Sequence, residues 1–539
     1  MQADIIIAGG GTAGSLLAGR LSEDPGLRVV VLEAGPNDRN PLIRVPKGMA
    51  KLLSDPEFTY YYPTQPDADW IKPEVMMRGR MLGGSSGING MVYHRGQPAD
   101  YDRWEELGLA GWGWRDMQRC FTALEDHLLP QTEWRGRGGA LPIRVATSFP
   151  PLLRAMIEAA GANGLPFKEE PNLLDQVGAG SVAENIDKSG KRVSAARAFL
   201  PPHVRRRPHL QIMTGTRVER ILFDADKRAC AVTCRRGSDT LEIRASREII
   251  LCTGTIESPR ILQISGVGPA ALLNRIGVPV VRASEGVGSN YRDHYCVQPQ
   301  WRLRRHQDSE NRDLRGFRQG LSALRYMVTR GGPLGYGSHR ISMFADVASG
   351  SGRADAEFLF APYSLDQRPG LEKIEMEAEP GGHFAVFPLR GTSQGMVEAA
   401  SSDPGDLPVI RPRYLDSDYD RQVTVAAVRL MRKIMSDPVM QPFVVGETGE
   451  LAKAQSDDEI IDAARRFGSS AYHSIGTCRM GSVHDKGAVL DASLRVRGVQ
   501  GLRVVDCSVM PEQVSANTMG PVMAIAWRAC EIIQEELRV

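Results

Sequence analysis

Residues 4–14 read DIIIAGGGTAG, and this stretch decides the fold. The apolar run leads into Gly9, Gly11 and Gly14, which have the spacing G-x-G-x-x-G, and an apolar helical pattern follows. In such a unit the first glycine makes a tight turn, the second lets the backbone approach a pyrophosphate, and the third lets the helix pack on the strand. The helix N-terminus then offers free N–H groups to phosphates. The stretch predicts a strand, turn and helix that bind a dinucleotide.

An acid follows where this kind of unit places one. A second apolar run, residues 29–32, ends at Glu33, about 20 residues beyond the last glycine. A carboxylate there accepts hydrogen bonds from a ribose 2′-OH and repels a 2′-phosphate, which argues against NADP. The alternative, a glycine-rich turn without a ligand, is disfavoured because strand, helix and acid are all in place. The residues expected to contact the dinucleotide are Gly9, Gly11, Thr12, Ala13, Gly14, Glu33 and Ala34.

The chain has 539 residues, which is long enough for two or more domains. Its composition, 42% hydrophobic and 24% charged with a net charge of +2, is that of a globular protein and gives no ground for a nucleic-acid partner. No apolar run of about 18 residues is present, so we expect no transmembrane segment. Because the core pattern begins at Asp4, we expect no signal peptide and a cytoplasmic protein. The eight cysteines are scattered, which favours reduced thiols and no metal site.

Two longer motifs are more specific than the glycine loop. Residues 79–96 read GRMLGGSSGINGMVYHRG, and residues 254–268 read GTIESPRILQISGVG. The glycines of the first motif let the backbone come very close to a flat ligand. With these motifs the chain resembles the glucose–methanol–choline (GMC) oxidoreductases, which are FAD enzymes. The resemblance covers nearly the whole chain and is strongest to the choline-dehydrogenase-like alcohol dehydrogenases.

The resemblance implies a fold and a division into domains. The fold class is α/β (α+β), with a Rossmann-like FAD-binding domain and a second, substrate-binding domain built on an antiparallel sheet. The FAD-binding domain would consist of residues 1–155, 195–295 and 480–539, and the substrate-binding domain of residues 156–194 and 296–479. We expect a monomer or a homodimer.

The resemblance also implies which residues contact FAD. Residues 84–92 would line the isoalloxazine and pyrophosphate, and because relatives with covalent FAD carry a histidine where this chain has Ile88, we expect non-covalent FAD. Asp506 ends a buried strand and would bond the ribityl or pyrophosphate region, with a core salt bridge as the alternative. His94 lies outside the covalent position and is interpreted as structural. The full set implied by the resemblance is Gly84, Ser85, Asn89, Gly90, Met91, Val92, Val218, Thr253, Asp506, Cys507, Thr518 and Met519.

Alcohol oxidation needs a base for the O–H proton and an acceptor for the hydride on carbon. Flavin N5 accepts the hydride, and histidine suits the role of base because its pKa lies near the operating pH. His473 stands where the family keeps its catalytic base, and Asn517 where it keeps a His or Asn that bonds the same substrate oxygen. Asparagine is no base at ordinary pH, so that role goes to His473. The alternative is a core histidine satisfied by the backbone.

The predicted activity is oxidation of a primary alcohol to an aldehyde, with electrons passed to a quinone-like acceptor or to oxygen. The alternatives are an alcohol oxidase that makes hydrogen peroxide, a hydroxynitrile lyase that uses flavin only as a scaffold, and a non-catalytic flavoprotein. The substrate is a small molecule. Tyr60–Tyr62 and Tyr472 hint at an apolar or aromatic alcohol, and no acid can be assigned as the partner of a quaternary amine.

Four other stretches carry local expectations. Residues 36–78, rich in proline, predict a long irregular connection, which is either a lid or a surface wrap. Residues 100–126 are amphipathic and predict core helix. Residues 286–294, GVGSNYRDH, also resemble the family and are assigned to the junction between domains without a chemical role. The charge density of residues 302–318 predicts a solvated segment.

Overall fold

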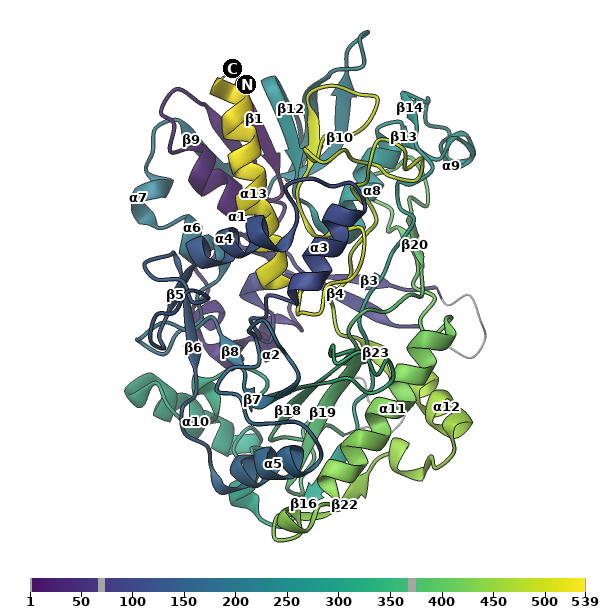
Figure 1. Ribbon diagram of the computed structural model, residues 1–539. Helices are drawn as coiled ribbons and strands as arrows, with labels where there is room; N and C mark the ends of the chain where they lie inside the picture. Colours follow the sequence, from purple (N-terminus) through teal and green to yellow (C-terminus); the bar gives the residue numbers. More distant parts are fainter. Residues whose placement is uncertain (1, 66–72, 367–374, 539) are drawn as a thin grey trace.

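The computed structural model describes residues 2–65, 73–366 and 375–538. Within these residues two large sheets lie toward opposite ends of the molecule, with helices packed around them (Figure 1). Both chain ends lie beside the first sheet, and the glycine-rich stretch follows its central strand. The predicted α/β fold class is confirmed.

The first sheet, within the described residues, has seven strands in the order β10-β11-β12-β1-β2-β9, with β24 paired to β12. Their bounds are β1 (Gln2–Ala8), β2 (Val29–Leu32), β9 (Leu210–Met213), β10 (Arg217–Phe223), β11 (Ala229–Arg236), β12 (Asp239–Leu251) and β24 (Leu502–Val504). β1, β2, β9, β24 and the end of β12 run parallel, and all of β2 is buried, as expected for a sheet covered on both faces. The first part of β12, residues 239–244, instead pairs antiparallel with β11.

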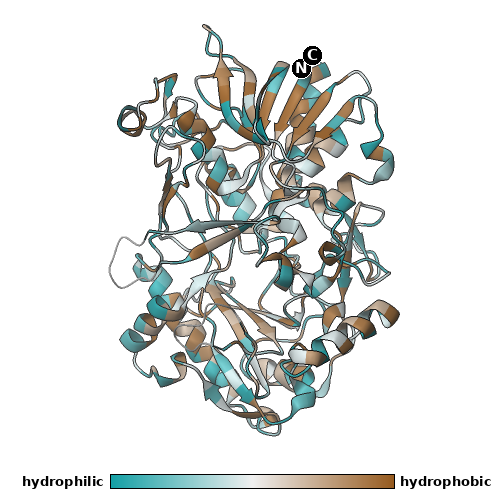
Figure 2. Cartoon of the chain, turned by 180° about the vertical axis from the view of Figure 1, so that it is seen from behind, coloured by the Kyte–Doolittle hydropathy of each residue, from teal (hydrophilic) through white to brown (hydrophobic). Residues whose placement is uncertain are grey.

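Helices from both ends of the chain cover this sheet. α13 (Met519–Arg538) packs against α1 (Thr12–Leu21) and α4 (Trp114–Leu124), and α8 (Gly254–Ile264) begins shortly after β12. Apolar residues are concentrated in the strands of this sheet (Figure 2). Residues 100–126 form two helices, α3 (Pro98–Glu106) and α4, because Gly108 and Gly111 between them have φ of +87° and +83°.

The second sheet, again within the described residues, has six antiparallel strands in the order β22-β16-β19-β18-β17-β7. Their bounds are β7 (Gly178–Ser181), β16 (Gln300–Leu303), β17 (Ile341–Ala345), β18 (Ala356–Ala361), β19 (Gly381–Pro388) and β22 (Val444–Thr448). One face packs its apolar side chains with those of α5 (Pro151–Ala162) and α11 (Asp418–Met435). Because side chains alternate along a strand, Phe344, Leu359 and Phe387 belong to the opposite face and form a separate cluster there.

The connection over residues 36–78 is more regular than predicted. β3 (Thr59–Pro63) and β4 (Val75–Gly79) form an antiparallel hairpin, and the aromatic residues at 60–62 belong to its first strand. Tyr62 is buried, and its hydroxyl donates to Glu257 over 2.9 Å. The part of the connection at residues 66–72 lies outside the described residues. A run of aromatic residues suits a strand, so the prolines obscured a signal that was present.

Candidate active site

The glycine loop has no room for side chains. A Cβ on Gly9, whose φ is +100°, would lie 2.5 Å from the Cys252 carbonyl oxygen, and one on Gly14 would lie 1.9 Å from that of Gly9. α1 has no side-chain cap and no acid in its first turn, and within the described residues Ser15 makes the first backbone hydrogen bond of the helix. The N–H groups of Thr12 and Ala13 are therefore open to an anion.

Glu33 lies against this loop. Its carboxylate accepts from Gly10 N over 2.9 Å and from Gly35 N over 2.8 Å. Burial raises the pKa of Glu33 to about 7, and the two N–H donors act in the opposite direction. The carbonyl of Glu33 accepts from Thr216 N over 2.8 Å, which brings the start of β10 and its residue Val218 close to the end of β2.

The second motif packs directly on the first. A Cβ on Gly84 would lie 2.8 Å from Gly11 Cα, so the two backbones are in contact. Asn89 Nδ2 lies 3.0 Å from Met519 Sδ, which joins two more of the predicted FAD contacts. Asn89 Oδ1 accepts from Arg192 Nη1 over 2.6 Å. The predicted cofactor residues are therefore close together in space.

Arg192 is a residue that sequence reasoning missed. It is 1% exposed and also donates to the carbonyl oxygens of Ser86 and Pro46. In the described part of the chain it forms no ion pair, and burial lowers its pKa to about 9. A buried cation without a counterion therefore holds the glycine-rich loop in place.

Asp506 is buried, and it caps helices instead of forming a salt bridge. Its Oδ2 accepts from Gly254 N over 2.9 Å and from Ser258 Oγ over 2.6 Å, and its Oδ1 accepts from Ser508 N over 2.8 Å. No ion pair of Asp506 exists among the described residues, so the alternative of a core salt bridge is wrong. Burial raises the pKa of Asp506 despite these donors. Thr253 lies beside it, with its hydroxyl 2.8 Å from that of Ser258.

The structure brings His473 and Asn517 together, although 44 residues separate them. Asn517 Nδ2 lies 3.0 Å from His473 Nε2. Asn517 lies just before α13, and His473 lies in the loop after β23 (Ser469–Ser470). Hydrogen bonds hold both backbone groups of His473. Its N–H donates to Asp293 Oδ1 over 2.8 Å, and its carbonyl accepts from the Gln513 side chain over 3.2 Å.

Two further histidines fix the protonation of this pair. His294 Nε2 lies 2.8 Å from the Leu389 carbonyl, which can only accept, so in the neutral ring His294 Nδ1 carries the lone pair. His473 Nδ1 lies 3.0 Å from that lone pair and must donate to it. His473 Nε2 therefore carries a lone pair of its own, and Asn517 Nδ2 donates to it. Burial lowers the pKa of His294 to about 4 and that of His473 well below its usual value, so both rings are neutral.

His94 orients the amide from the other side. Its Nδ1 lies 2.9 Å from Asn517 Oδ1 and 3.1 Å from Glu357 Oε1, and both oxygens require a proton on Nδ1. The amide oxygen thus faces His94, and the amide nitrogen faces His473. His94 was expected to be structural and residues 286–294 to lack a chemical role, yet His94 and His294 both contact the predicted catalytic pair. The family-like stretch at 286–294 was the only sequence signal for His294.

The residues present fit FAD. The backbone has no room for a Cβ at Gly9 or Gly14, the N–H groups of α1 are open, and the carboxylate of Glu33 stands at the end of β2. A neutral imidazole with a free Nε2 lone pair belongs to the same group of residues. These features are those of a flavin-dependent oxidoreductase.

Comparison with known proteins agrees. Family models described as GMC oxidoreductase match residues 3–296 and 391–526. The chain is 34% identical to the oxygen-dependent choline dehydrogenase of Brucella anthropi, over 99% of this chain and 96% of the relative. It is 36% identical to the mitochondrial choline dehydrogenase of Homo sapiens, over 98% and 89%. Pyridoxine 4-oxidase from Mesorbium loti superposes with a TM-score of 0.87 at 30% identity, covering 99% of both chains.

The chain belongs to the GMC oxidoreductase family. It is an FAD-dependent oxidoreductase that acts on the CH–OH group of alcohols.

Proposed function

We propose that this enzyme oxidises a primary alcohol to an aldehyde with His473 Nε2 as the general base, and that the electrons pass to a quinone-like acceptor or to oxygen. The observation that carries the proposal is the hydrogen-bonded chain from Leu389 through His294 to His473, which leaves a lone pair on Nε2 beside Asn517. The FAD contacts and the domain division predicted from the sequence are part of the same proposal.

Each of the four site residues has a separate role in the proposed reaction. A substrate hydroxyl replaces the direct bond between His473 Nε2 and Asn517 Nδ2: it donates its proton to the imidazole and accepts a hydrogen bond from the amide. His94 keeps the amide nitrogen turned toward the substrate, and His294 keeps Nε2 free of a proton. FAD, when bound, supplies the hydride acceptor at N5. The proton and the hydride thus leave the same carbinol in different directions.

The proposed substrate class starts from the relatives. Two of them are named choline dehydrogenases, one of which is named oxygen-dependent, and a neighbouring solved structure is a pyridoxine 4-oxidase. All three names denote action on a small alcohol. We include oxygen as an acceptor because the relative from Brucella anthropi carries it in its name.

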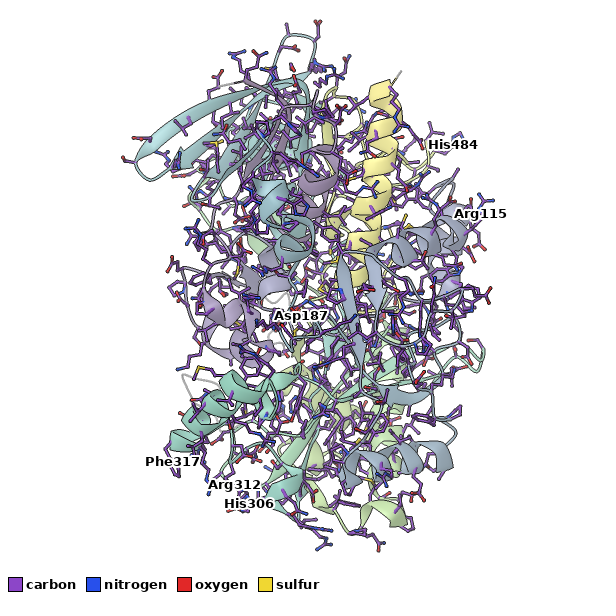
Figure 3. The ribbon with its side chains drawn as sticks, turned by 90° about the vertical axis from the view of Figure 1, so that its left-hand side faces the viewer. Arg115, Asp187, His306, Arg312, Phe317 and His484 are labelled. Atoms are coloured by element: carbon purple, nitrogen blue, oxygen red, sulfur yellow. The ribbon has the colours of Figure 1, made fainter. Side chains whose placement is uncertain are left out.

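His473→Gln tests the base, with anaerobic stopped-flow reduction of the bound flavin by a panel of aliphatic, aromatic and amino alcohols. The expected loss is about 100-fold or more in the reduction rate with FAD still bound. His484→Gln is the matched control, because His484 is exposed at the outer edge of the molecule (Figure 3). If the native flavin stays oxidised with every alcohol while a cyanohydrin is cleaved, the lyase alternative replaces the proposal. If His473→Gln keeps its full rate, the role of base is refuted.

A further inference from the structure

A cluster of charged and polar side chains lies further along the sheet face that Phe387 shares with His473, and it takes no part in the mechanism above. It is called the cation cluster here and consists of Lys47, Tyr336, His339, Arg340, Tyr363 and His383. The Arg340 guanidinium lies 3.8 Å from the centre of the Tyr336 ring, and Lys47 Nζ lies 4.5 Å from it. Tyr363 links Lys47 to His383, and the rings of His339 and His383 are 6.0 Å apart.

The cluster carries one cation that no acid neutralises. Lys47 and Glu310 are both buried and form an ion pair, and Glu310 also accepts from the Tyr336 hydroxyl. Arg340 is only partly exposed, and among the described residues no carboxylate pairs with it. A partly buried guanidinium without a counterion is a binding place for a carboxylate or phosphate, which it can hold through two parallel hydrogen bonds.

Both imidazoles of the cluster have an open nitrogen. Ser338 Oγ lies 3.2 Å from the Gly90 carbonyl and donates to it, so it accepts from His339 Nδ1 over 2.7 Å. His383 Nδ1 donates to the Tyr363 carbonyl over 2.6 Å. Neither Nε2 has a hydrogen-bond partner among the described residues. The two rings therefore accept hydrogen bonds from a ligand that carries hydroxyl groups.

The cluster shares a surface with the catalytic histidine. His383, Ala385 and Phe387 alternate along β19 and lie on one face of the sheet. The Phe387 ring is 5.7 Å from the His473 ring, and His383 lies about 13 Å further along the strand at about 3.3 Å per residue. Ala385 between them is small and partly exposed. At the other side, Ser338 is bonded to Gly90 of the expected flavin loop.

We propose that the alcohol oxidised here carries an anionic group, a carboxylate or a phosphate, which Arg340 binds while the CH–OH end reaches His473. The inference rests on the proposed function of this site. It distinguishes this enzyme from its relatives named for choline, because a quaternary ammonium would meet the unpaired guanidinium at the far end of the site. Hydroxyl groups on the substrate face His339 and His383.

Flavin reduction by matched alcohols tests the proposal. An alcohol whose anionic group is far enough from its CH–OH end, 12-hydroxydodecanoate, should reduce the native enzyme with a kcat/KM at least about 10-fold above that of 1-dodecanol or choline, which is the size of one charged hydrogen bond. Arg340→Gln should remove this preference and leave 1-dodecanol unchanged, and Arg340→Lys should keep part of it. Arg312→Gln is the matched control, since Arg312 lies on the outer surface (Figure 3).

Binding of dodecanoate, which carries the same anionic group and cannot be oxidised as an alcohol, is the second measurement and is followed by the change in the flavin absorption spectrum. Arg340→Gln should weaken it about 10-fold or more. If the native enzyme prefers choline, or if Arg340→Gln changes neither the preference nor this binding, the anion site is refuted while His473-dependent oxidation stands. If no alcohol reduces the flavin, the proposed function fails, and the binding measurement still decides the anion site.

A second, independent observation concerns α10 (Gly316–Thr329), which lies on the outer surface. Its large apolar side chains point to solvent: Phe317 is 78% exposed, Leu321 57%, Leu324 54%, Met327 61% and Val328 76%. Spacings of four, three and four residues from Phe317 to Val328 place them in one stripe along the helix. Only Ser322 and Tyr326 of this helix are buried, on the opposite side. Figure 3 shows Phe317 at the outer edge of the molecule, near Arg312.

The charge around the stripe indicates its partner. Residues 312–330 contain five arginines and one aspartate, so this surface is strongly positive. A second copy docked face to face would bring like charges together, whereas an anionic lipid surface attracts them. None of the helices in the described ranges is long and apolar enough to cross a bilayer. An amphipathic helix with an apolar stripe and basic flanks instead lies in the headgroup region.

We infer that α10 docks this enzyme on a membrane surface that contains anionic lipids. The apolar stripe would lie about 5–10 Å deep in the interface, with Arg318 and Arg325 near the phosphates. This inference stands apart from the reaction and from the cation cluster.

Co-sedimentation with phosphatidylcholine vesicles, with and without about a third of phosphatidylglycerol, tests it. Binding should require the anionic lipid, and the double variant Phe317→Ser and Leu321→Ser should lose about 10-fold or more in partition coefficient with unchanged alcohol oxidation. Val483→Ser is the control, because Val483 is 84% exposed outside α10. Three results would refute docking on a membrane: equal binding to both kinds of vesicle, no effect of the double variant on binding, or a dimer in solution that the double variant dissociates.

Discussion

Asn517→Asp is expected to make alcohol oxidation strongly pH-dependent. In the native chain Asn517 Nδ2 donates to His473 Nε2 over 3.0 Å, and burial keeps the pKa of His473 well below its usual value. The lone pair on Nε2 is then free throughout the ordinary pH range. A carboxylate of the same shape can only accept a hydrogen bond, so it favours a proton on Nε2 and occupies the base.

The size of the expected change in proton binding at His473 follows from the distance between its Nε2 and the side chain of residue 517. Two unit charges 3.0 Å apart at an effective dielectric constant of about 20 attract each other by about 5 kcal/mol, which tightens proton binding by about three to four orders of magnitude. His294 does not compete for that proton, because burial lowers its own pKa to about 4. The rate of flavin reduction should therefore fall about 100-fold or more below neutral pH and recover about tenfold per pH unit as the base is freed.

Anaerobic stopped-flow reduction across the pH range in which the protein stays folded is the assay. Asn517→Ala is the control, because it removes the donor without adding a charge and should lower the rate without the recovery at high pH. FAD content is measured in both variants. An aspartate variant that is as fast as the native enzyme in acid, or equally slow at every pH, would show that Nε2 does not carry the reactive lone pair.

The remaining predictions concern the cofactor site and stability. Gly14→Ala should yield a protein without bound flavin, because its Cβ would lie 1.9 Å from a carbonyl oxygen, whereas Gly161→Ala in α5 meets open space and should keep flavin and melting temperature. Arg192→Met removes three hydrogen bonds, which costs about 3 kcal/mol, and should raise the flavin fraction lost on ultrafiltration. The pKa values of His294 and His383 are about 4, against about 6.5 when unfolded, so the unfolded chain binds more protons as the pH falls. Protonation of each of these two histidines should therefore lower the free energy of unfolding by about 3 kcal/mol between about pH 6.5 and about pH 4. The midpoint of urea unfolding should fall over this pH range, and it should fall less steeply in His294→Phe.

Much of the first sheet could be predicted, because its information is local. A buried strand, three glycines and an acid specify their own geometry within residues 4–33, and β1, α1 and β2 lie where the pattern placed them. His473 and Asn517 were predicted only through the resemblance, since nothing local marks a catalytic histidine. The prediction of a long irregular connection at residues 36–78 was wrong over the hairpin of β3 and β4, because prolines masked the run of aromatic residues in β3.

The contacts that the sequence could not supply are those between distant segments. His294 lies 179 residues from His473, and His94 lies 423 residues from Asn517, so only the folded chain brings them into contact. The sequence also could not show whether the apolar stripe of α10 faces solvent or the protein interior. Charge density predicts solvent for residues 302–318, and periodicity allows a helix beyond them, but both patterns are equally consistent with a helix that buries its apolar side.

The geometry of the base depends on both halves of the molecule. Phe387 of the second sheet packs on His473, whereas Asn517 lies just before α13, which packs beside the first sheet. The 3.0 Å bond between the two side chains therefore crosses from one half to the other, and a shift of about 1 Å between the halves would break it. Buried histidines on either side, His94 and His294, oppose such a shift because each bonds one member of the pair. The burial of His294 and His473 reduces stability in acid, but it leaves Nε2 of His473 without a proton. A surface histidine would protonate near neutral pH and would lose the lone pair on which the reaction depends.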